Sequence, residues 1–300
     1  MAPEQLRGLW GFPLTPFSDD RVDLDQLGRL TSYQVDGGVD AVCACGAIAQ
    51  AEVLSKAERF DCLRAVLEAT AARVPVVMTL PGDGEAPETA AWAQQLGASA
   101  ALVLPIASDV QDIRATLDGI RDAAPGLPVV LYHRPPLLLA PDELRELCSF
   151  AEFLGIKDGY RDVRLCRRLR CAAERPLLWL SAWEDVALAF FALGFDAFAP
   201  ASTAYAPQYA RAWLERLRSC DLEGASRLLE AHAYPMVDLR LSRPNIEVSV
   251  VKAALQACGL ASGQTRPPAQ PLTASEIVTV ERLVAEMQAV LDKGALAAFE

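Results

Sequence analysis

One lysine stands apart from the other ionisable residues of this chain. Lys157 is one of only four lysines, and it lies near the end of the apolar run Phe153–Asp158. A buried ammonium group is costly unless it is paired or loses its proton, and a neutral lysine amine is a nucleophile that forms imines with carbonyl compounds. The alternative is a structural lysine paired with Asp158 or Asp185. Lys157 is therefore the first candidate catalytic residue.

Two further candidates lie at the end of another apolar run, Pro128–His133, and directly after it. A tyrosine hydroxyl near an amine can relay protons, which makes Tyr132 a second candidate catalytic residue. An arginine can bind a carboxylate through two parallel hydrogen bonds, which makes Arg134 a candidate substrate-binding residue. The alternatives are a packed aromatic ring for Tyr132 and a solvated loop arginine for Arg134. We expect His133 to be packed rather than to act as a base.

The eight cysteines and two histidines give little support for metal or thiol chemistry. No Cys-x-x-Cys pair occurs, so we expect no metal site and free thiols in a reducing compartment. Cys43 and Cys45 alternate in the run Val39–Cys45, which predicts that they share one face of a strand. The sequence assigns neither thiol a base partner, and we interpret both as small core residues.

Eight short apolar runs of this kind alternate with longer amphipathic stretches. Continuous apolar runs are typical of parallel strands covered on both faces, and eight strand–helix repeats close most naturally into a (β/α)₈ TIM barrel. In such a barrel the catalytic groups lie at the carboxyl ends of the strands, where Tyr132 and Lys157 are expected. The predicted strands are Leu9–Thr15, Val39–Cys45, Pro75–Leu80, Ala100–Pro105, Pro128–His133, Phe153–Asp158, Leu177–Ser181 and Ala197–Ala201.

The last hundred residues lack such runs. We predict a barrel over residues 1–205 and a C-terminal helical extension over residues 206–300, packed on the barrel. The pattern predicts helices over 206–218, 221–233, 246–258 and 273–292, with a connecting loop over 261–272 that contains Gly, Pro, Ser and Gln.

Composition excludes several classes of protein. Apolar residues make up 52% of the 300 residues, enough for a large core, and no run of about 18 residues is apolar and free of charge or proline. The net charge of −11 argues against a nucleic-acid partner. The amino-terminal residues lack a signal-peptide pattern, so we expect a cytoplasmic protein with no membrane partner.

Three segments resemble one known family. Gly11-Phe12-Pro13-Leu14-Thr15-Pro16-Phe17, Leu131-Tyr132-His133-Arg134 and Gly155-Ile156-Lys157-Asp158-Gly159 are similar to signature segments of the dihydrodipicolinate synthase and N-acetylneuraminate lyase superfamily. The resemblance extends from about residue 8 to residue 260. Within the superfamily, Tyr-x-Arg and Lys-Asp-Gly look most like the 5-dehydro-4-deoxyglucarate dehydratase-like members.

This resemblance implies a function. It implies that Lys157 forms an imine with a sugar-derived 2-keto acid, that Tyr132 relays protons, and that Arg134 is a candidate for the distal carboxylate of the substrate. It also implies a homo-oligomer, a tetramer or dimer, with no metal and no cofactor beyond the covalent imine. Water elimination and retro-aldol cleavage share one carbanion, and the Tyr-x-Arg segment favours dehydration.

The loop after the second predicted strand departs from the family pattern. The family has Gly-Thr-Thr-Gly-Glu or Gly-Gly-Thr-Gly-Glu there, with threonines that hold the carboxylate, whereas this chain has Gly46-Ala47-Ile48-Ala49-Gln50. Backbone N–H groups remain to hold an anion, so Gly46, Ala47 and Ile48 stay candidate substrate-binding residues. We add Ser202, after the eighth predicted strand.

A second loop also departs, because Ile106 follows Pro105 where the family usually has a tyrosine. These departures support an alternative function, a catalytically altered or non-catalytic barrel that binds a keto acid or a partner protein. Retention of both Lys157 and Tyr132 argues against it.

Overall fold

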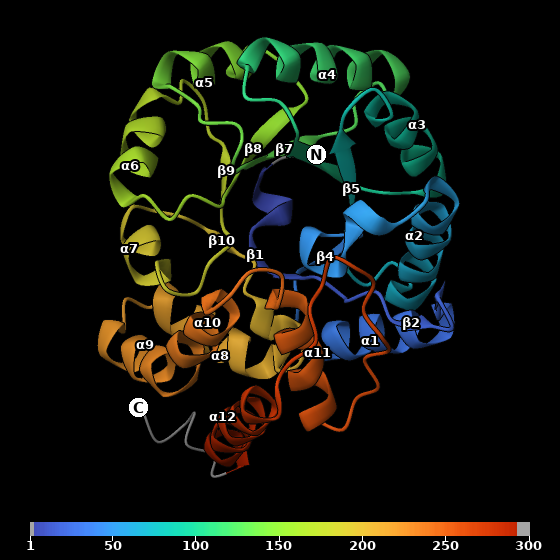
Figure 1. The fold of residues 1–300 in the computed structure, drawn as a ribbon. Helices are drawn as coiled ribbons and strands as arrows, with labels where there is room; N and C mark the ends of the chain where they lie inside the picture. Colours follow the sequence, from blue (N-terminus) through green and yellow to red (C-terminus); the bar gives the residue numbers. More distant parts are fainter. Residues whose placement is uncertain (1–2, 293–300) are drawn as a thin grey trace.

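Eight parallel strands close into a barrel at the centre of the molecule (Figure 1). The computed structural model describes residues 3–292. Around the barrel the strands follow the order β1-β10-β9-β8-β7-β6-β5-β4. All eight predicted strands are confirmed, and with them the TIM barrel. Their bounds are β1 Gly8–Gly11, β4 Ala41–Ala44, β5 Val76–Gly82, β6 Ala100–Pro105, β7 Val129–His133, β8 Phe153–Asp158, β9 Leu178–Ser181 and β10 Ala197–Phe198; a separate antiparallel pair is formed by β2 Phe17–Ser18 and β3 Arg21–Val22.

Helices surround the barrel, one after each strand of the closed sheet. The predicted capping box is present at α2, where Ser55 and Glu58 satisfy each other's backbone N–H groups. None of the helices in residues 3–292 combines the length and apolarity needed to cross a membrane. The barrel helices are α1 Leu24–Asp36, α2 Lys56–Thr70, α3 Ala86–Leu96, α4 Val110–Ala123, α5 Pro141–Cys148, α6 Val163–Ala172, α7 Ala187–Ala192 and α8 Pro207–Arg218.

Strand alternation divides the core into two layers. Leu131 and Ile156 belong to the layer between the strands and the helices. Their neighbours Val130 and Tyr132 belong to the cluster inside the barrel, which also contains Phe12. Because side chains alternate across a strand, β7 and β8 can cover the barrel with apolar groups and still direct Tyr132 and Lys157 inward.

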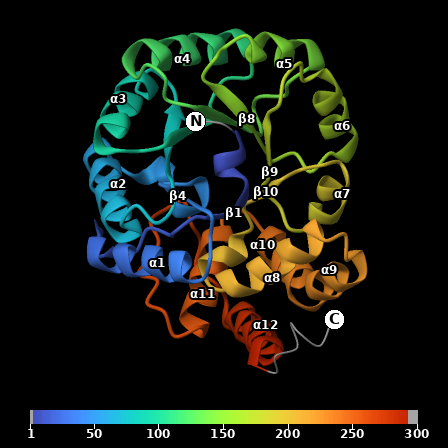
Figure 2. The ribbon, with the colours of Figure 1, turned by 180° about the vertical axis from the view of Figure 1, so that it is seen from behind.

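Further helices gather on one side of the barrel, next to α1 and α8 (Figures 1 and 2). One of them was not predicted. The stretch 221–233 ends in a π turn, and the chain then continues into α10, which contains Pro235. No helix was predicted over residues 234–245, and Pro235 is tolerated there because it lies in the first turn of α10, where a missing N–H group costs little. Residues 293–300 of the predicted extension lie outside the described residues. The elements are α9 Leu222–Leu228, the π turn Leu229–Ala233, α10 Tyr234–Leu241, α11 Glu247–Ala257 and α12 Ala274–Asp292.

Candidate active site

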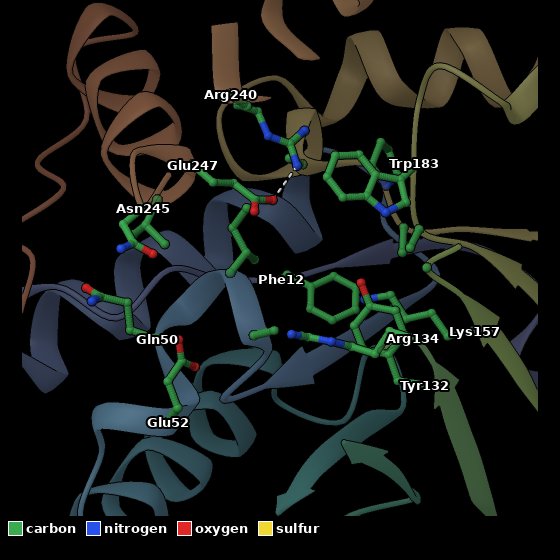
Figure 3. Close-up of a pocket in the computed structure, with 18 of the residues that line it drawn as sticks. Phe12, Gln50, Glu52, Tyr132, Arg134, Lys157, Trp183, Arg240, Asn245 and Glu247 are labelled. Carbon is green, nitrogen blue, oxygen red and sulfur yellow. Dashed lines mark hydrogen bonds and ion pairs between the residues drawn. The ribbon is translucent and has the colours of Figure 1, made fainter. Parts of the chain in front are cut away.

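A cavity of about 410 Å³ opens at the carboxyl ends of the barrel strands (Figure 3). Tyr132 and Lys157 come from β7 and β8, and they face each other across neighbouring strands because the two residues are register partners. The opposite wall comes from α10, α11 and the segment between α11 and α12. The cavity is lined by Phe12, Ala47, Ile48, Gln50, Glu52, Tyr132, Arg134, Pro135, Lys157, Gly159, Ala182, Trp183, Ala199, Pro200, Ala201, Arg240, Asn245, Glu247, Val248, Pro268 and Ala269.

Lys157 presents its amine to this cavity between two aromatic rings. Its Nζ lies 4.1 Å from the ring centre of Phe12 and 4.4 Å from that of Tyr132. The residue is only 6% exposed. Burial lowers the pKa of Lys157 to about 8. A substantial fraction of the amine is therefore neutral, and nucleophilic, slightly above neutral pH.

The structure contradicts the alternative in which Lys157 pairs with Asp158 or Asp185. Asp158 points out of the barrel, where it accepts hydrogen bonds from the Arg161 backbone N–H at 3.0 Å and the Cys166 thiol at 3.2 Å. Asp185 pairs with Arg161 at 3.1 Å. Within residues 3–292, Lys157 has no carboxylate within ion-pair distance.

Tyr132 and Arg134 lie beside the lysine. Tyr132 is buried, and burial raises the pKa of its hydroxyl to about 12, so it is protonated and can donate a proton at neutral pH. The Arg134 guanidinium stacks 5.4 Å from the Tyr132 ring centre. Arg134 has no carboxylate partner in the part of the chain that the structure describes, so its hydrogen-bond donors face the cavity. His133 is packed, as predicted, and its Nε2 accepts the Leu139 backbone N–H at 3.0 Å.

Gly46 does not line the cavity, but it determines where Phe12 can lie. A Cβ atom at Gly46 would come within 2.5 Å of the Phe12 ring. The absence of a side chain therefore allows this ring to approach, and so to stay against Lys157. Phe12 was not among the predicted site residues, because a phenylalanine in an apolar segment gives no sign of function.

Ala47 and Ile48 do line the cavity, and they form the short turn Ala47–Ala49 after β4. Neither side chain can form a hydrogen bond, so this part of the wall is apolar. Ser202 lies outside the cavity wall, and its buried backbone N–H donates to Glu184 at 3.4 Å. The geometry thus brings together Lys157, Tyr132, Arg134, Ala47 and Ile48, and leaves Gly46 and Ser202 behind the wall.

A buried arginine on α10 completes the opposite wall. The side chain of Arg240 is 3% exposed and donates to Glu184 at 3.1 Å and to Glu247 at 2.6 Å. Burial alone would lower the pKa of Arg240, but the charges of Glu184 and Glu247 outweigh it and raise that pKa. The Trp183 ring contacts this guanidinium and that of Arg161, with ring-centre distances of 5.1 and 4.7 Å. Sequence reasoning missed this cluster.

The predicted connecting loop, residues 261–272, also reaches the cavity through Pro268 and Ala269. Arg266 fixes it by pairing with Glu58 at 2.6 Å, which holds the pKa of that carboxyl at about 2. The Gln50 side chain donates to the Arg266 carbonyl at 2.7 Å. The loop is therefore a fixed part of the cavity wall.

The cysteine prediction was wrong in one respect. Cys43 lies inside the barrel, 3.2 Å from the Thr79 hydroxyl, whereas Cys45 lies outside with its thiol towards the Arg59 carbonyl. The alternation fails because β4 ends at Ala44 and Cys45 has a φ of 54°. Among the described residues, no group of three or more His, Cys, Asp or Glu side chains is placed to hold a metal ion.

Comparison with known proteins identifies the family. A family model described as "Dihydrodipicolinate synthetase family" matches residues 5–287. The chain belongs to this family. A relative from Streptomyces avermitilis, named "Probable 5-dehydro-4-deoxyglucarate dehydratase 2", is 32% identical over 287 residues, which cover 93% of this chain and 86% of the relative. A relative from Methylobacterium radiotolerans, named "Probable 5-dehydro-4-deoxyglucarate dehydratase", is 30% identical over 292 residues, or 93% of this chain and 94% of the relative.

Solved structures of the family have the same fold. Dihydrodipicolinate synthase from Bacillus clausii is similar with a TM-score of 0.88 and 25% identity, over 95% of this chain and 99% of that one. The family prediction is thus confirmed, including the similarity to relatives named as dehydratases. At the level of the dihydrodipicolinate synthetase family, the chain is an enzyme of the lyase type.

Proposed function

We propose that the chain is a lyase that forms an imine between Lys157 and a sugar-derived 2-keto acid, and that it eliminates water from that acid. Tyr132 relays protons and Arg134 binds a substrate carboxylate. No metal or organic cofactor is part of the proposal, because the protonated imine is itself the electron sink. The names of the relatives support dehydration over carbon–carbon cleavage.

The proposed reaction balances without an external reagent. The neutral Lys157 amine adds to the keto carbon, and water leaves as the imine forms. A proton is then removed from the next carbon, and its electron pair forms an enamine. The enamine expels the hydroxyl group one carbon further on, which leaves as water with a proton delivered through Tyr132. Hydrolysis of the resulting imine consumes one water, frees Lys157 and gives an unsaturated keto acid.

One observation carries the proposal. Lys157, a buried lysine with a lowered pKa and no carboxylate partner within residues 3–292, lies at the wall of a substrate-sized cavity, over the ring of Tyr132. A structural lysine would be expected to have a hydrogen-bond acceptor, since an unpaired buried ammonium is unfavourable. Perturbed ionisable groups in clefts are typical of catalytic sites.

Trapping of the imine tests the proposal. The protein is incubated with pyruvate and with a panel of sugar-derived 2-keto acids, reduced with borohydride, digested and analysed by peptide mass spectrometry. We expect a ligand-dependent mass increase on the peptide that contains Lys157 and none in Lys157→Ala. The peptide with Lys252, the other lysine that is buried among the described residues, is an internal control that stays unmodified. No adduct in folded protein would overturn the proposal.

A second candidate function rests on the apolar wall at Ala47 and Ile48. A barrel that binds a keto acid or a partner without catalysis would need no hydroxyl groups there. Binding measured by calorimetry in the absence of any borohydride adduct would favour this function.

We also propose that copies of the chain associate. The exposed apolar side chains of Ile106 (61% exposed) and Leu138 (57% exposed) follow the neighbouring strands β6 and β7 and support this proposal. Sedimentation of the purified protein gives its mass in solution, and a monomer at micromolar concentration would contradict it.

A further inference from the structure

The candidate residues on the barrel side of the cavity account for both ends of a dicarboxylic keto acid. The turn at Ala47 and Ile48 is the candidate for the carboxylate beside the keto group. Lys157 is the candidate for the keto carbon and Arg134 for the distal carboxylate. The hydroxyl groups that a sugar-derived acid carries between these ends have no assigned partner. The wall across the cavity, from α10 and α11, is the part left to bind them (Figure 3).

Arg240, the arginine of that wall, does not compete with Arg134 for the distal carboxylate. Its two terminal nitrogens donate to Glu184 at 3.1 Å and to Glu247 at 2.6 Å. The side chains of Arg240 and Glu184 are both buried. Since one guanidinium is shared between two carboxylates, the three residues together carry a net charge of −1, and the cluster does not attract a further anion.

Glu247 is the member of this cluster that reaches the cavity. It belongs to the cavity wall, and 41% of its side chain is accessible. Its Oε1 accepts from Arg240, whereas its Oε2 has no hydrogen-bond partner within residues 3–292. An ionised carboxylate only accepts hydrogen bonds. The contact with Arg240 therefore fixes the position of an acceptor that remains free to bind a ligand.

A hydroxyl group is the part of such a substrate that this oxygen can bind. A hydroxyl group donates to a carboxylate in a charge-assisted hydrogen bond, which is stronger than one between neutral groups. The carboxylates of the substrate only accept, and Glu247 repels them towards the barrel side. Tyr132 packs against Lys157 and is the proposed partner of the hydroxyl group that leaves. Glu247, across the cavity, suits a hydroxyl group that stays (Figure 3).

We propose that Glu247, held in place by Arg240, binds a hydroxyl group that the substrate carries between the hydroxyl group that is eliminated and the distal carboxylate. This inference rests on the proposed function, which places the keto carbon at Lys157 and a substrate carboxylate at Arg134. Glu247 is thereby a specificity-determining residue contributed by the C-terminal helices rather than by a barrel strand.

Two dicarboxylic keto acids that differ by one hydroxyl group test the proposal. 2-Oxoadipate has no hydroxyl group, and 5-hydroxy-2-oxoadipate, used as its separate enantiomers, has one beside the distal carboxylate. Neither acid has the hydroxyl group that the proposed reaction eliminates, so both bind without turnover. We expect calorimetry at pH 7 to show that the wild-type protein binds one enantiomer about tenfold more tightly than 2-oxoadipate, as for a charge-assisted hydrogen bond in a partly exposed site.

Replacement of Glu247 should remove this preference. In Glu247→Gln the amide oxygen can still accept from Arg240, but the charged acceptor is lost, so we expect the affinities for the two acids to differ by about threefold or less. Glu52→Gln is the matched control, because Glu52 is the other carboxylate among the residues of the wall and lies away from Arg240 (Figure 3). It removes the same charge, so the affinities for both acids should change equally and the preference should stay.

Circular dichroism checks that each variant is folded. If Glu247→Gln does not fold, Glu247→Asp takes its place, since it keeps the charge and withdraws the acceptor by one methylene group. Equal affinities of the wild-type protein for all three ligands, tighter binding of 2-oxoadipate, or no binding would each overturn the proposal. So would an unchanged preference in the folded variant at Glu247, or a preference that Glu52→Gln removes as well.

Borohydride trapping of the same complexes separates this inference from the proposed function. An adduct on Lys157 with both acids, formed at equal affinities, would leave the imine chemistry in place and overturn the inference. A preference that Glu247→Gln removes, without any adduct, would support hydroxyl binding by Glu247 and contradict the imine chemistry.

Discussion

The two buried lysines within residues 3–292 differ in what surrounds the amine rather than in how deeply they are buried. Lys157 is 6% exposed and Lys252 is 4% exposed, and burial lowers the pKa of both, to about 8 and about 7. Lys252 donates hydrogen bonds to the carbonyl oxygen of Thr15 at 2.7 Å and to that of Gln264. Lys157 has aromatic rings in place of such acceptors.

This difference shows that a lowered pKa does not by itself identify a nucleophile. The Lys252 amine donates hydrogen bonds to two backbone carbonyls and so holds the segment after α11 in place. The Lys157 amine, in contrast, borders an open cavity. An amine must be both neutral and accessible to attack a carbonyl group. The comparison therefore predicts opposite consequences when each lysine is replaced.

Replacement of Lys157 should have the largest effect. Lys157→Met keeps the length and the apolar stem but removes the nucleophile, so we expect the rate of keto-acid turnover to fall by about 10³-fold or more. Because Lys157 has no hydrogen-bond partner in the part of the chain that the structure describes, the free energy of unfolding should change by less than about 1 kcal/mol. Steady-state kinetics and urea unfolding measure the two effects. Turnover by Lys157→Met at the wild-type rate would contradict the assignment of Lys157 as the nucleophile.

Removal of the Tyr132 hydroxyl should have the next largest effect. Tyr132→Phe makes the surroundings of Lys157 resemble those of Lys252, whose neighbouring ring is Phe17. We expect kcat to fall by about 10²-fold or more, as for loss of a proton-transfer group, while the borohydride adduct still forms. If kcat is unchanged, Tyr132 only packs against the lysine. Single-turnover experiments distinguish slow imine formation from slow elimination.

Lys252→Met should lower the stability of the protein and leave the chemistry at Lys157 unchanged, the opposite of what is expected for Lys157→Met. The substitution leaves the Thr15 and Gln264 carbonyls without their donor, so we expect the free energy of unfolding to fall by about 2–4 kcal/mol. The yield of the Lys157 adduct, measured at a temperature where the variant is folded, should not change. An unaltered urea midpoint would contradict the structural role of Lys252.

The smallest expected effect is the pH dependence of imine trapping at Lys157. The neutral amine is the reactive form, so the rate of imine trapping should rise about tenfold per pH unit up to about pH 8 and then level off. Lys157→Met gives the background rate, to which Lys252 would contribute. A midpoint near 10.5, the ordinary value for lysine, would show that the Lys157 amine is solvated.

The strands and the reactive lysine could be predicted because their signals are local. A buried parallel strand is a continuous apolar run, and a lysine inside such a run is conspicuous. The Arg240 cluster could not be predicted in this way. Its burial depends on Glu184, which lies 56 residues earlier in the chain, and on helix α10, in a stretch where no helix was predicted.

The structural roles of several small residues could not be predicted from the sequence either. Nothing in the sequence indicates that Gly46 leaves room for the ring of Phe12, since that contact joins two segments separated along the chain. The inward direction of Cys43 and the outward direction of Cys45 depend on a left-handed backbone conformation at one residue. Such a conformation is uncommon for residues other than glycine, so no pattern of residue types predicts it here.

The wall contributed by residues 261–272 lies outside the sheet. Substitutions at Pro268 or Ala269 alter the shape of the cavity without disturbing a strand, its register or the catalytic lysine. The anchors of the segment, Lys252 and Arg266, keep its position while its surface changes. Members of this family can therefore evolve new substrate preferences in a segment that mutates independently of the reaction centre.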